Sequence, residues 1–161
     1  MKKTLLLCSI LFLIAINNFA QQTKIDSLLI FLKTDKVDTN QLIHLYELSN
    51  EFSNIDNYAD GIKYGNEVIK FSKVLSNNSN KSIQKTIKIY TGKAYYNLGS
   101  INYHKNNYPE AVKNHLAAVK IHEEVGDKKS VAASYNIIGN TYRSQANYPQ
   151  ALKNHYAALK I

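Results

Sequence analysis

Histidine is the residue type in this chain whose chemistry first suggests a site, because a neutral imidazole is the commonest metal ligand. The chain has five histidines, and His115 and His155 stand 40 residues apart inside two nearly identical segments. A histidine copied together with its surroundings indicates a structural or surface position that the segment repeats. His104 and His122 belong to no acid–histidine pairing that recurs at ligand spacing. The sequence therefore predicts neither a metal site nor a cofactor.

Catalytic motifs are also missing from the sequence. It has no glycine-rich phosphate loop and no nucleophile elbow. Cys8 is the only cysteine, so the chain after it has no thiol nucleophile, cysteine metal site or disulfide. The carboxylates of Glu123 and Glu124 precede a Gly-Asp turn and are expected to be solvated. An enzyme that uses a groove of the fold is the alternative, but no residue supports it, and we predict a non-catalytic protein.

The chain is basic, with a formal net charge of +8. Nucleic-acid binding would require the positive charge to gather into a patch or stripe. Here the lysines are spread along the whole sequence. The charge therefore predicts a solvated surface and no nucleic-acid partner.

The first 20 residues are typical of a secretory signal peptide. Lys2 and Lys3 form a positive start, Thr4–Ile16 is an apolar run too short for a stable span, and Ala20 is the expected cleavage residue before Gln21. We predict export to the periplasm or the cell exterior, with no stable membrane span in the mature chain. Its charge would be 18 − 12 = +6.

Two alternatives apply to the same segment. The first alternative is that residues 1–20 are not cleaved and stay on the protein as a membrane anchor. A lipoprotein site at Cys8 is discounted, because Leu7 stands where a small residue is needed and the cysteine comes too early in the run.

A self-similar segment dominates the rest of the chain. Asn147–Ile161 repeats Asn107–Ile121, with eleven of fifteen positions identical. Each copy is preceded by a segment of the form Tyr-x-x-hydrophobic-Gly, which ends at Gly99 in one case and at Gly139 in the other. Self-similarity at such a spacing is the signature of a repeat array.

Apolar residues recur with helical spacing, and no stretch alternates with the period of a strand. We expect seven helices in antiparallel pairs, at about 24–33, 40–55, 58–75, 82–105, 109–125, 128–145 and 149–161. Asp38 or Thr39 is expected to cap the second helix and Asp127 the sixth. The buried apolar residues of the second and third helices are predicted to be Leu42, Leu45, Leu48, Phe52, Ile62, Val68, Ile69, and Val74 or Leu75.

The residues that recur together resemble the tetratricopeptide repeat. They are Tyr95, Leu98, Gly99, Tyr108, Ala111 and Ala118 in one unit and Tyr135, Ile138, Gly139, Tyr142, Tyr148, Ala151 and Ala158 in the next. The resemblance implies an all-α, right-handed superhelix of stacked antiparallel helix pairs. The glycines and alanines would then let two helices approach closely, with the larger side chains filling the remaining space.

The match departs from the family in its period, which is 40 residues here and about 34 in the usual repeat. The long period of this chain resembles the repeats of kinesin light chains, of bacterial (Bacteroidota-like) sensor proteins and of peptide-pheromone receptors. Asn102 stands where the family has a tyrosine, with Tyr103 beside it. We predict a short helix and connection at 21–39, followed by an array at 40–161 with a degenerate unit at 40–75, a full unit at 82–125 and an incomplete unit at 128–161.

The resemblance also indicates a binding surface, because the first helix of each unit lines the concave face in this family. Beside its buried stripe, each of these first helices has a second stripe, offset by one residue. The second stripe consists of Tyr96, Ser100 and Tyr103 in the full unit, Asn136, Asn140 and Arg143 in the last unit, and Tyr46, Asn50 and Ser53 in the degenerate unit. Asparagine both donates to and accepts from a peptide backbone, and arginine pairs with a carboxylate. We predict a groove for an extended peptide; the alternative is that these side chains are merely exposed.

The predicted function is therefore a protein- or peptide-binding scaffold. The alternative is the extracytoplasmic input region of a truncated signalling protein, whose output would be a histidine kinase, a cyclase or a transcriptional regulator. The last predicted helix still has the apolar pattern of an internal repeat. We therefore expect a fragment of a longer protein, or self-association through the uncapped last helix pair.

Overall fold

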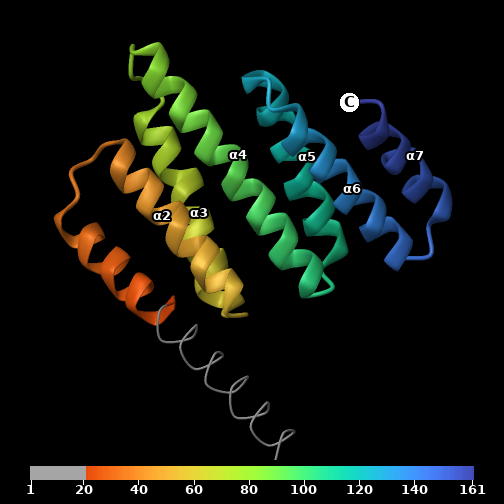
Figure 1. Cartoon of the computed structure of the whole chain (residues 1–161), viewed down its shortest axis with the longest axis horizontal. Coiled ribbons are helices and arrows are strands. Elements are labelled where there is room, and N and C mark those ends of the chain that lie inside the picture. The colour runs from red at the N-terminus through yellow and green to blue at the C-terminus, as the bar shows by residue number, and fades with distance from the viewer. Residues whose placement is uncertain (1–20) are drawn as a thin grey trace, which may run out of the picture.

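The computed structural model describes residues 21–161, so the predicted signal peptide at 1–20 lies outside the described residues. Residues 21–34 are helical, and six further helices follow along the chain (Figure 1). These are α2 (Thr39–Asn54), α3 (Tyr58–Leu75), α4 (Lys81–His104), α5 (Tyr108–Val125), α6 (Lys128–Ser144) and α7 (Tyr148–Leu159). Residues 21–161 contain no strand. Within this range, no helix is both long and apolar enough to cross a bilayer.

The helices stack as consecutive pairs, α2 with α3, α4 with α5 and α6 with α7. Neighbouring pairs are joined by contacts of α3 with α4 and of α5 with α6. In addition, α2 contacts α4, and α4 contacts α6. The all-α fold of stacked antiparallel helix pairs that the sequence predicts is thus confirmed (Figure 1).

The turns inside the three pairs share one backbone conformation. Asp56, Asn106 and Ala146 have φ values of 57°, 59° and 56°, in the left-handed region. In each turn the next N–H donates to the carbonyl five residues earlier, at 2.8–2.9 Å, as in the Schellman motif. The tyrosine after two of these turns adds a side-chain bond: Tyr58 donates to Asp56, and Tyr108 donates to Asn106.

Polar side chains fix most helix starts. The Asp38 carboxylate accepts from the N–H groups of Asn40 and Gln41 and so caps α2. The Asp127 carboxylate accepts from the N–H of Ser130 and caps α6. Both helix starts agree with the sequence prediction, because such caps satisfy amide groups that have no partner inside the helix.

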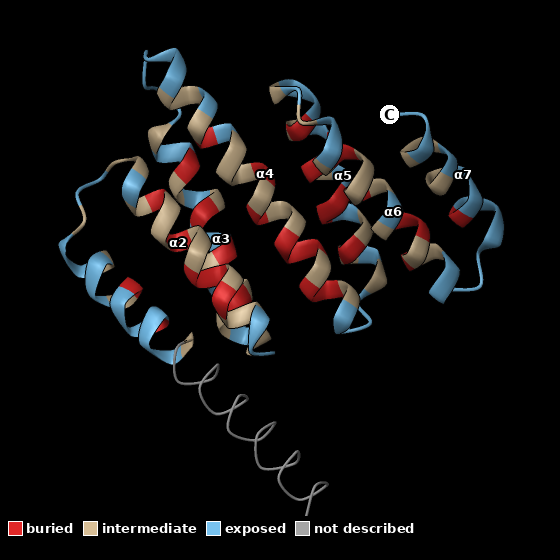
Figure 2. Cartoon of the chain, viewed as in Figure 1, coloured by how far each residue is buried: buried red, intermediate tan, exposed pale blue. Residues whose placement is uncertain are grey.

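The buried residues run along the facing sides of the helices (Figure 2). Leu42, Leu45, Leu48 and Val68 are buried as predicted. Of the two alternatives at the end of α3, Val74 is wrong, because it is 61% exposed. Leu75 instead packs against the core, together with Ile69 and others.

The helical residues 21–34 cover the open side of α2. Ile25 and Leu28 are buried there against Leu48. The carboxylate of Glu51 accepts hydrogen bonds from Lys24 at 2.7 Å and from Gln21 at 3.1 Å. An apolar contact and a charged pair together hold this helix on the first pair of the array.

Glycine allows the closest approach inside the two C-terminal pairs. A Cβ atom at Gly99 would lie 2.6 Å from Cδ2 of His115, and one at Gly139 would lie 2.7 Å from Cε1 of His155. The sequence prediction that Gly139 sits where two helices touch is therefore confirmed. What the sequence did not show is that a histidine ring fills the space left by each glycine.

The α7 helix has much of its apolar surface in solvent. Ala151 is buried, whereas Leu152, Tyr156 and Leu159 are 56%, 55% and 80% exposed. Among the described helices, α7 contacts only α6. It also ends at Leu159 and does not continue to Ile161 as the sequence predicted.

Candidate ligand-binding site on the inner helices

The helices α2, α4 and α6 are the first members of the three pairs and lie next to one another. We call the side of the array that they share the inner face. Residues that are three or four positions apart share one face of a helix. The predicted binding residues follow this spacing on all three helices, and two of them, Tyr46 of α2 and Tyr96 of α4, line one pocket.

On α4 the predicted residues already have partners within the protein. The ring of Tyr96 meets the ring of His115 edge-on, with centroids 5.2 Å apart. The hydroxyl of Ser100 donates to the Tyr96 carbonyl of the preceding turn. The hydroxyl of Tyr103 lies 3.5 Å from Oγ of Ser144 and so links α4 to α6.

On α6 the predicted residues are more available to a ligand. Asn136 is exposed, with its Oδ1 atom 3.3 Å from Nδ1 of His155. Asn140 is half-buried and has no side-chain hydrogen bond within the described part of the chain. Arg143 is exposed, and no carboxylate of residues 21–161 lies within 4.0 Å of its guanidinium. Asn140 and Arg143 are therefore free to pair with a ligand.

On α2, Tyr46, Asn50 and Ser53 are all half-buried. Tyr46 packs edge-on against Tyr90 of α4, with ring centroids 5.5 Å apart. Burial raises the pKa of Tyr46, and the nearby Tyr90 and Glu47 add to the effect. Burial also raises the pKa of Tyr96. Both phenols therefore stay neutral at physiological pH and act as rigid aromatic walls with a polar tip.

A pocket of about 310 Å³ opens between the three inner helices. Its volume lies at the lower end of the range for small-ligand sites, about 300–1,000 Å³. It is lined by Tyr46, Lys93, Tyr96, His122, Asp127, Lys129, Ser130 and Ala133. Only Tyr46 and Tyr96 of the predicted binding residues reach it. The other predicted residues do not line this pocket.

The sequence analysis missed the charged residues of the pocket. Lys93 stands one helical turn before Tyr96, on the same face of α4. Lys129 stands two turns before Asn136, on the same face of α6. Following both stripes one or two turns toward the helix starts would have found these lysines. His122 and Asp127 come from the end of α5 and the turn after it, and no helical spacing connects them with the stripes.

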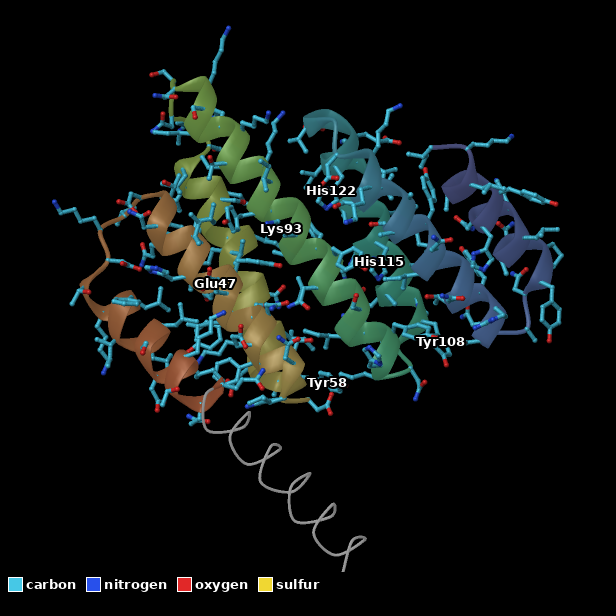
Figure 3. All side chains as sticks on the ribbon, in the orientation of Figure 1. Glu47, Tyr58, Lys93, Tyr108, His115 and His122 are labelled. Carbon is cyan, nitrogen blue, oxygen red and sulfur yellow. The ribbon has the colours of Figure 1, made fainter. Side chains whose placement is uncertain are left out.

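Lys93, labelled on α4 in Figure 3, contacts two aromatic rings. Its Nζ atom lies 4.8 Å from the centroid of the Tyr90 ring and 5.6 Å from that of Tyr46. Such cation–π contacts contribute about 0.5–1 kcal/mol at exposed sites and more where water is excluded. They position the ammonium group at the pocket without neutralising its charge.

His122 and Asp127 both line the pocket. His122 is buried, and its Nδ1 atom lies 3.7 Å from Oδ2 of Asp127. Burial lowers the pKa of His122, although Asp127 and the Gly92 carbonyl offset part of the effect. The hydrogen bonds from Ser130 lower the pKa of Asp127. At neutral pH the pocket lining therefore includes a neutral imidazole and an ionised carboxylate.

The histidines do not assemble with acids into a larger group. No cluster of three or more His, Cys, Asp and Glu side chains gathers within residues 21–161. His115 is fully buried, and both of its ring nitrogens lack a hydrogen-bond partner. Burial lowers the pKa of His115 to about 4. It fits the role of a packing residue, as the repeat of this position in the sequence indicated.

Comparison with known proteins agrees with this geometry. Residues 90–161, just under half of the chain, match the family model of the tetratricopeptide repeat. The search of curated proteins found no match to the chain. The tetratricopeptide repeat is a scaffold that generally mediates protein–protein interaction. The helix pairs from α4 to α7 thus carry the match, and the chain folds as an all-α, right-handed superhelix of the tetratricopeptide type.

Proposed function

We propose that this protein is a binding scaffold without chemistry of its own, and that an extended segment of a partner protein lies along its inner face. The surface of α6 carries the proposal. Asn140 and Arg143 lie one turn apart and lack partners within the described chain. Asn140 supplies a donor and an acceptor for a peptide backbone, and Arg143 supplies a fork for a carboxylate.

The arrangement of the inner helices supports an extended ligand over a compact one. Aromatic surface comes from Tyr46 on α2 and from Tyr96 and Tyr103 on the neighbouring helix α4. Tyrosine gives a large contact area at a low cost in conformational entropy. A ligand that crosses α2, α4 and α6 would meet aromatic contacts first and the amide and guanidinium groups of α6 last.

Nuclear magnetic resonance tests this proposal directly. A peptide is selected from a random library on the purified protein and titrated into the isotope-labelled chain. The amide shifts are expected to gather on α2, α4 and α6. Shifts that gather instead on the outer helices α3, α5 and α7 would contradict the proposed inner-face site.

A second candidate rests on the spacing of the repeats. Gly99 and Gly139 are 40 residues apart, and this long period resembles the input regions of bacterial sensor proteins. In that case the ligand bound on the inner face would be a signal. DNA sequencing beyond the last codon tests this candidate: an in-frame membrane segment and output domain would favour it, and a stop codon would disfavour it.

We also propose that the protein is exported, on the strength of Lys2, Lys3, the apolar run that follows them and Ala20. Mass spectrometry of the protein from its host is expected to find a mature N-terminus near Gln21. An intact Met1 in a cytoplasmic fraction would contradict export.

A further inference from the structure

We infer that one edge of the array docks on the surface of a bilayer that contains anionic lipids. The edge consists of the connections between helix pairs, the helical turns beside them and the C-terminus, which are residues 33–38, 73–88, 120–129 and 160–161. We call it the basic edge. The inference goes beyond the proposed function and does not depend on peptide binding at the inner face.

The alternating directions of the helices bring these segments to one side of the molecule. In Figure 1, α2, α4 and α6 begin on the upper side, where the described chain also ends, and the turns inside the pairs lie on the opposite side. Lys81 and Lys85 of α4 line one hollow with Glu124 of α5, and Lys128 of α6 lines another with Lys160. Segments that are distant in the sequence are therefore neighbours on the basic edge.

The basic edge has most of the net charge of the described chain. It has ten lysines, all exposed, and five acids, so its net charge is 10 − 5 = +5, out of 18 − 12 = +6 for residues 21–161. The corresponding segments on the opposite side, residues 51–63, 102–113 and 141–153, have five basic residues and four acids, so their net charge is 5 − 4 = +1. The ten lysines are Lys33, Lys36, Lys73, Lys81, Lys85, Lys88, Lys120, Lys128, Lys129 and Lys160.

This asymmetry comes from the acids, because the lysines are spread along the sequence and the acids are not. Between Glu67 and Glu110 the chain has seven lysines and no aspartate or glutamate. Of the five acids on the basic edge, Asp38 and Asp127 cap helices, and Glu124 accepts from a lysine of α4 at 2.9 Å. The excess positive charge therefore faces solvent, and it is greatest around the connection of α3 to α4.

A bilayer is a partner that all of these lysines can meet together. The negative potential of an anionic lipid surface strengthens binding about fivefold for each lysine that comes near it. The attraction falls off within a Debye length, about 8 Å at physiological ionic strength. Lysines on a single edge come within this distance at the same time, whereas lysines on all sides of a molecule do not.

Exposed aliphatic side chains on the same edge favour a bilayer over a nucleic acid. Val37 and Val74 are 68% and 61% exposed, and Ile161 at the end of the described chain is 42% exposed. At a membrane surface, such side chains enter the boundary between headgroups and acyl chains while lysines contact the headgroups. The phosphates of a nucleic acid would pair with the lysines but would leave the valines in water.

Vesicle co-sedimentation of the full chain tests this inference. Vesicles of phosphatidylcholine mixed with anionic phosphatidylglycerol are compared with vesicles of phosphatidylcholine alone. The protein is expected to bind the anionic vesicles more tightly, and high salt should remove the difference. A triple variant with Lys73→Gln, Lys81→Gln and Lys85→Gln should bind the anionic vesicles about a hundredfold more weakly.

The matched control is a triple variant with Lys63→Gln, Lys105→Gln and Lys153→Gln, which removes the same charge from exposed lysines outside the basic edge. It should bind anionic vesicles at least about tenfold more tightly than the first variant. Every variant keeps residues 1–20, so any contribution of that segment is common to all of them. Circular dichroism checks that the helices are intact.

Val74→Ser separates a bilayer from a soluble polyanion. It should weaken binding to anionic vesicles about fivefold, because an aliphatic side chain no longer enters the lipid boundary. Binding to a short DNA duplex is measured beside it. If the parent protein binds the duplex as tightly as the vesicles, and Val74→Ser binds vesicles as the parent does, the partner is a polyanion and the membrane inference is wrong.

Nuclear magnetic resonance locates the contact without any substitution. The isotope-labelled chain is mixed with anionic nanodiscs that contain a paramagnetic lipid. Amide signals of residues 33–38, 73–88 and 120–129 are expected to broaden most. Broadening that gathers at residues 55–57, 105–107 and 145–147, equal vesicle binding by the two triple variants, or no preference for anionic vesicles would each overturn the inference.

Discussion

Cδ2 of His115 lies 2.6 Å from the point that a Cβ atom at Gly99 would occupy, so the glycine of α4 and the histidine of α5 share one space. The next pair repeats this relationship with Gly139 and His155. The two histidines differ in burial, because His115 is fully buried and His155 is partly exposed. The same substitution should therefore have different effects at the two glycines.

Gly99→Ala is expected to lower the free energy of unfolding by about 1–3 kcal/mol, because the buried ring of His115 has nowhere to move. Gly139→Ala is expected to be milder. The ring of His155 can turn toward solvent, and alanine favours the helix by about 1 kcal/mol relative to glycine. Chemical denaturation of both variants measures the difference. Equal losses in the free energy of unfolding for Gly99→Ala and Gly139→Ala would show that the burial of the facing histidine does not determine the cost of the added methyl group.

The sequence was sufficient to predict the helices, because each helix depends on local signals such as its capping residue and the spacing of its apolar residues. Asp38 and Asp127 cap helices where the sequence placed them, and Leu42, Leu45 and Leu48 are buried with the predicted spacing. Two details differ: α7 ends at Leu159 and not at Ile161, and Val74, one of the two alternatives at the end of α3, is exposed. Val74 stands one residue from Leu75 at the end of α3, and periodicity alone cannot choose between neighbours where a helix ends.

The sequence was less informative about the site, because the pocket combines distant segments. Tyr46, Lys93 and Lys129 belong to three helices, and His122 reaches the pocket from a fourth. Spacing along one helix predicted Tyr46 and Tyr96, but it could not show which side chains meet. The prediction also treated Asn136 as a free groove residue, whereas its Oδ1 atom lies 3.3 Å from His155 Nδ1.

Ala146 offers a test of the shared turn. It has a φ of 56°, at the position where the other two turns have Asp56 and Asn106. Alanine is strained in this conformation by about 1–2 kcal/mol, and asparagine tolerates it better. It also leaves Tyr148 without the side-chain acceptor that Asn106 gives to Tyr108. Ala146→Asn is therefore expected to stabilise the protein by about 1 kcal/mol, measured by chemical denaturation.

Ala146→Gly separates the two causes, because glycine relieves the backbone but supplies no acceptor. Ala146→Gly should therefore give only part of the stabilisation expected for Ala146→Asn. The larger loss of conformational entropy when glycine folds offsets some of the relieved strain. In the Ala146→Asn background, Tyr148→Phe should remove the hydrogen-bond component. A destabilising effect of both Asn and Gly at position 146 would contradict the strain at this turn.

Acid should destabilise the protein through His115. The imidazole has a pKa of 6.5 when unperturbed and about 4 in the folded protein, because burial disfavours its charge. Between these values the unfolded chain binds more protons than the folded one, so the free energy of unfolding falls as the pH falls from 6.5 to 4. The full difference of 6.5 − 4 = 2.5 in pKa corresponds to at most about 3–4 kcal/mol.

His115→Leu removes this titration while keeping a side chain of similar volume. Its stability should depend less on pH across the same window than that of the parent protein. His104→Leu, which removes an exposed histidine at the end of α4, is the control substitution. Parallel stability curves for His115→Leu and the parent protein would show that His115 is not the group that titrates.

Binding by an Asn140→Ala variant tests the central claim most directly. Asn140 lies on the inner face and has no partner in the described chain, so its loss should spare the fold and remove only ligand contacts. In calorimetric titration with a selected peptide, Asn140→Ala is expected to weaken binding about fivefold, as the loss of a hydrogen bond does. Lys153→Ala, on the exposed surface of α7, is expected to bind as the parent protein does. Equal affinity of both variants for the peptide would contradict a ligand site on the inner face.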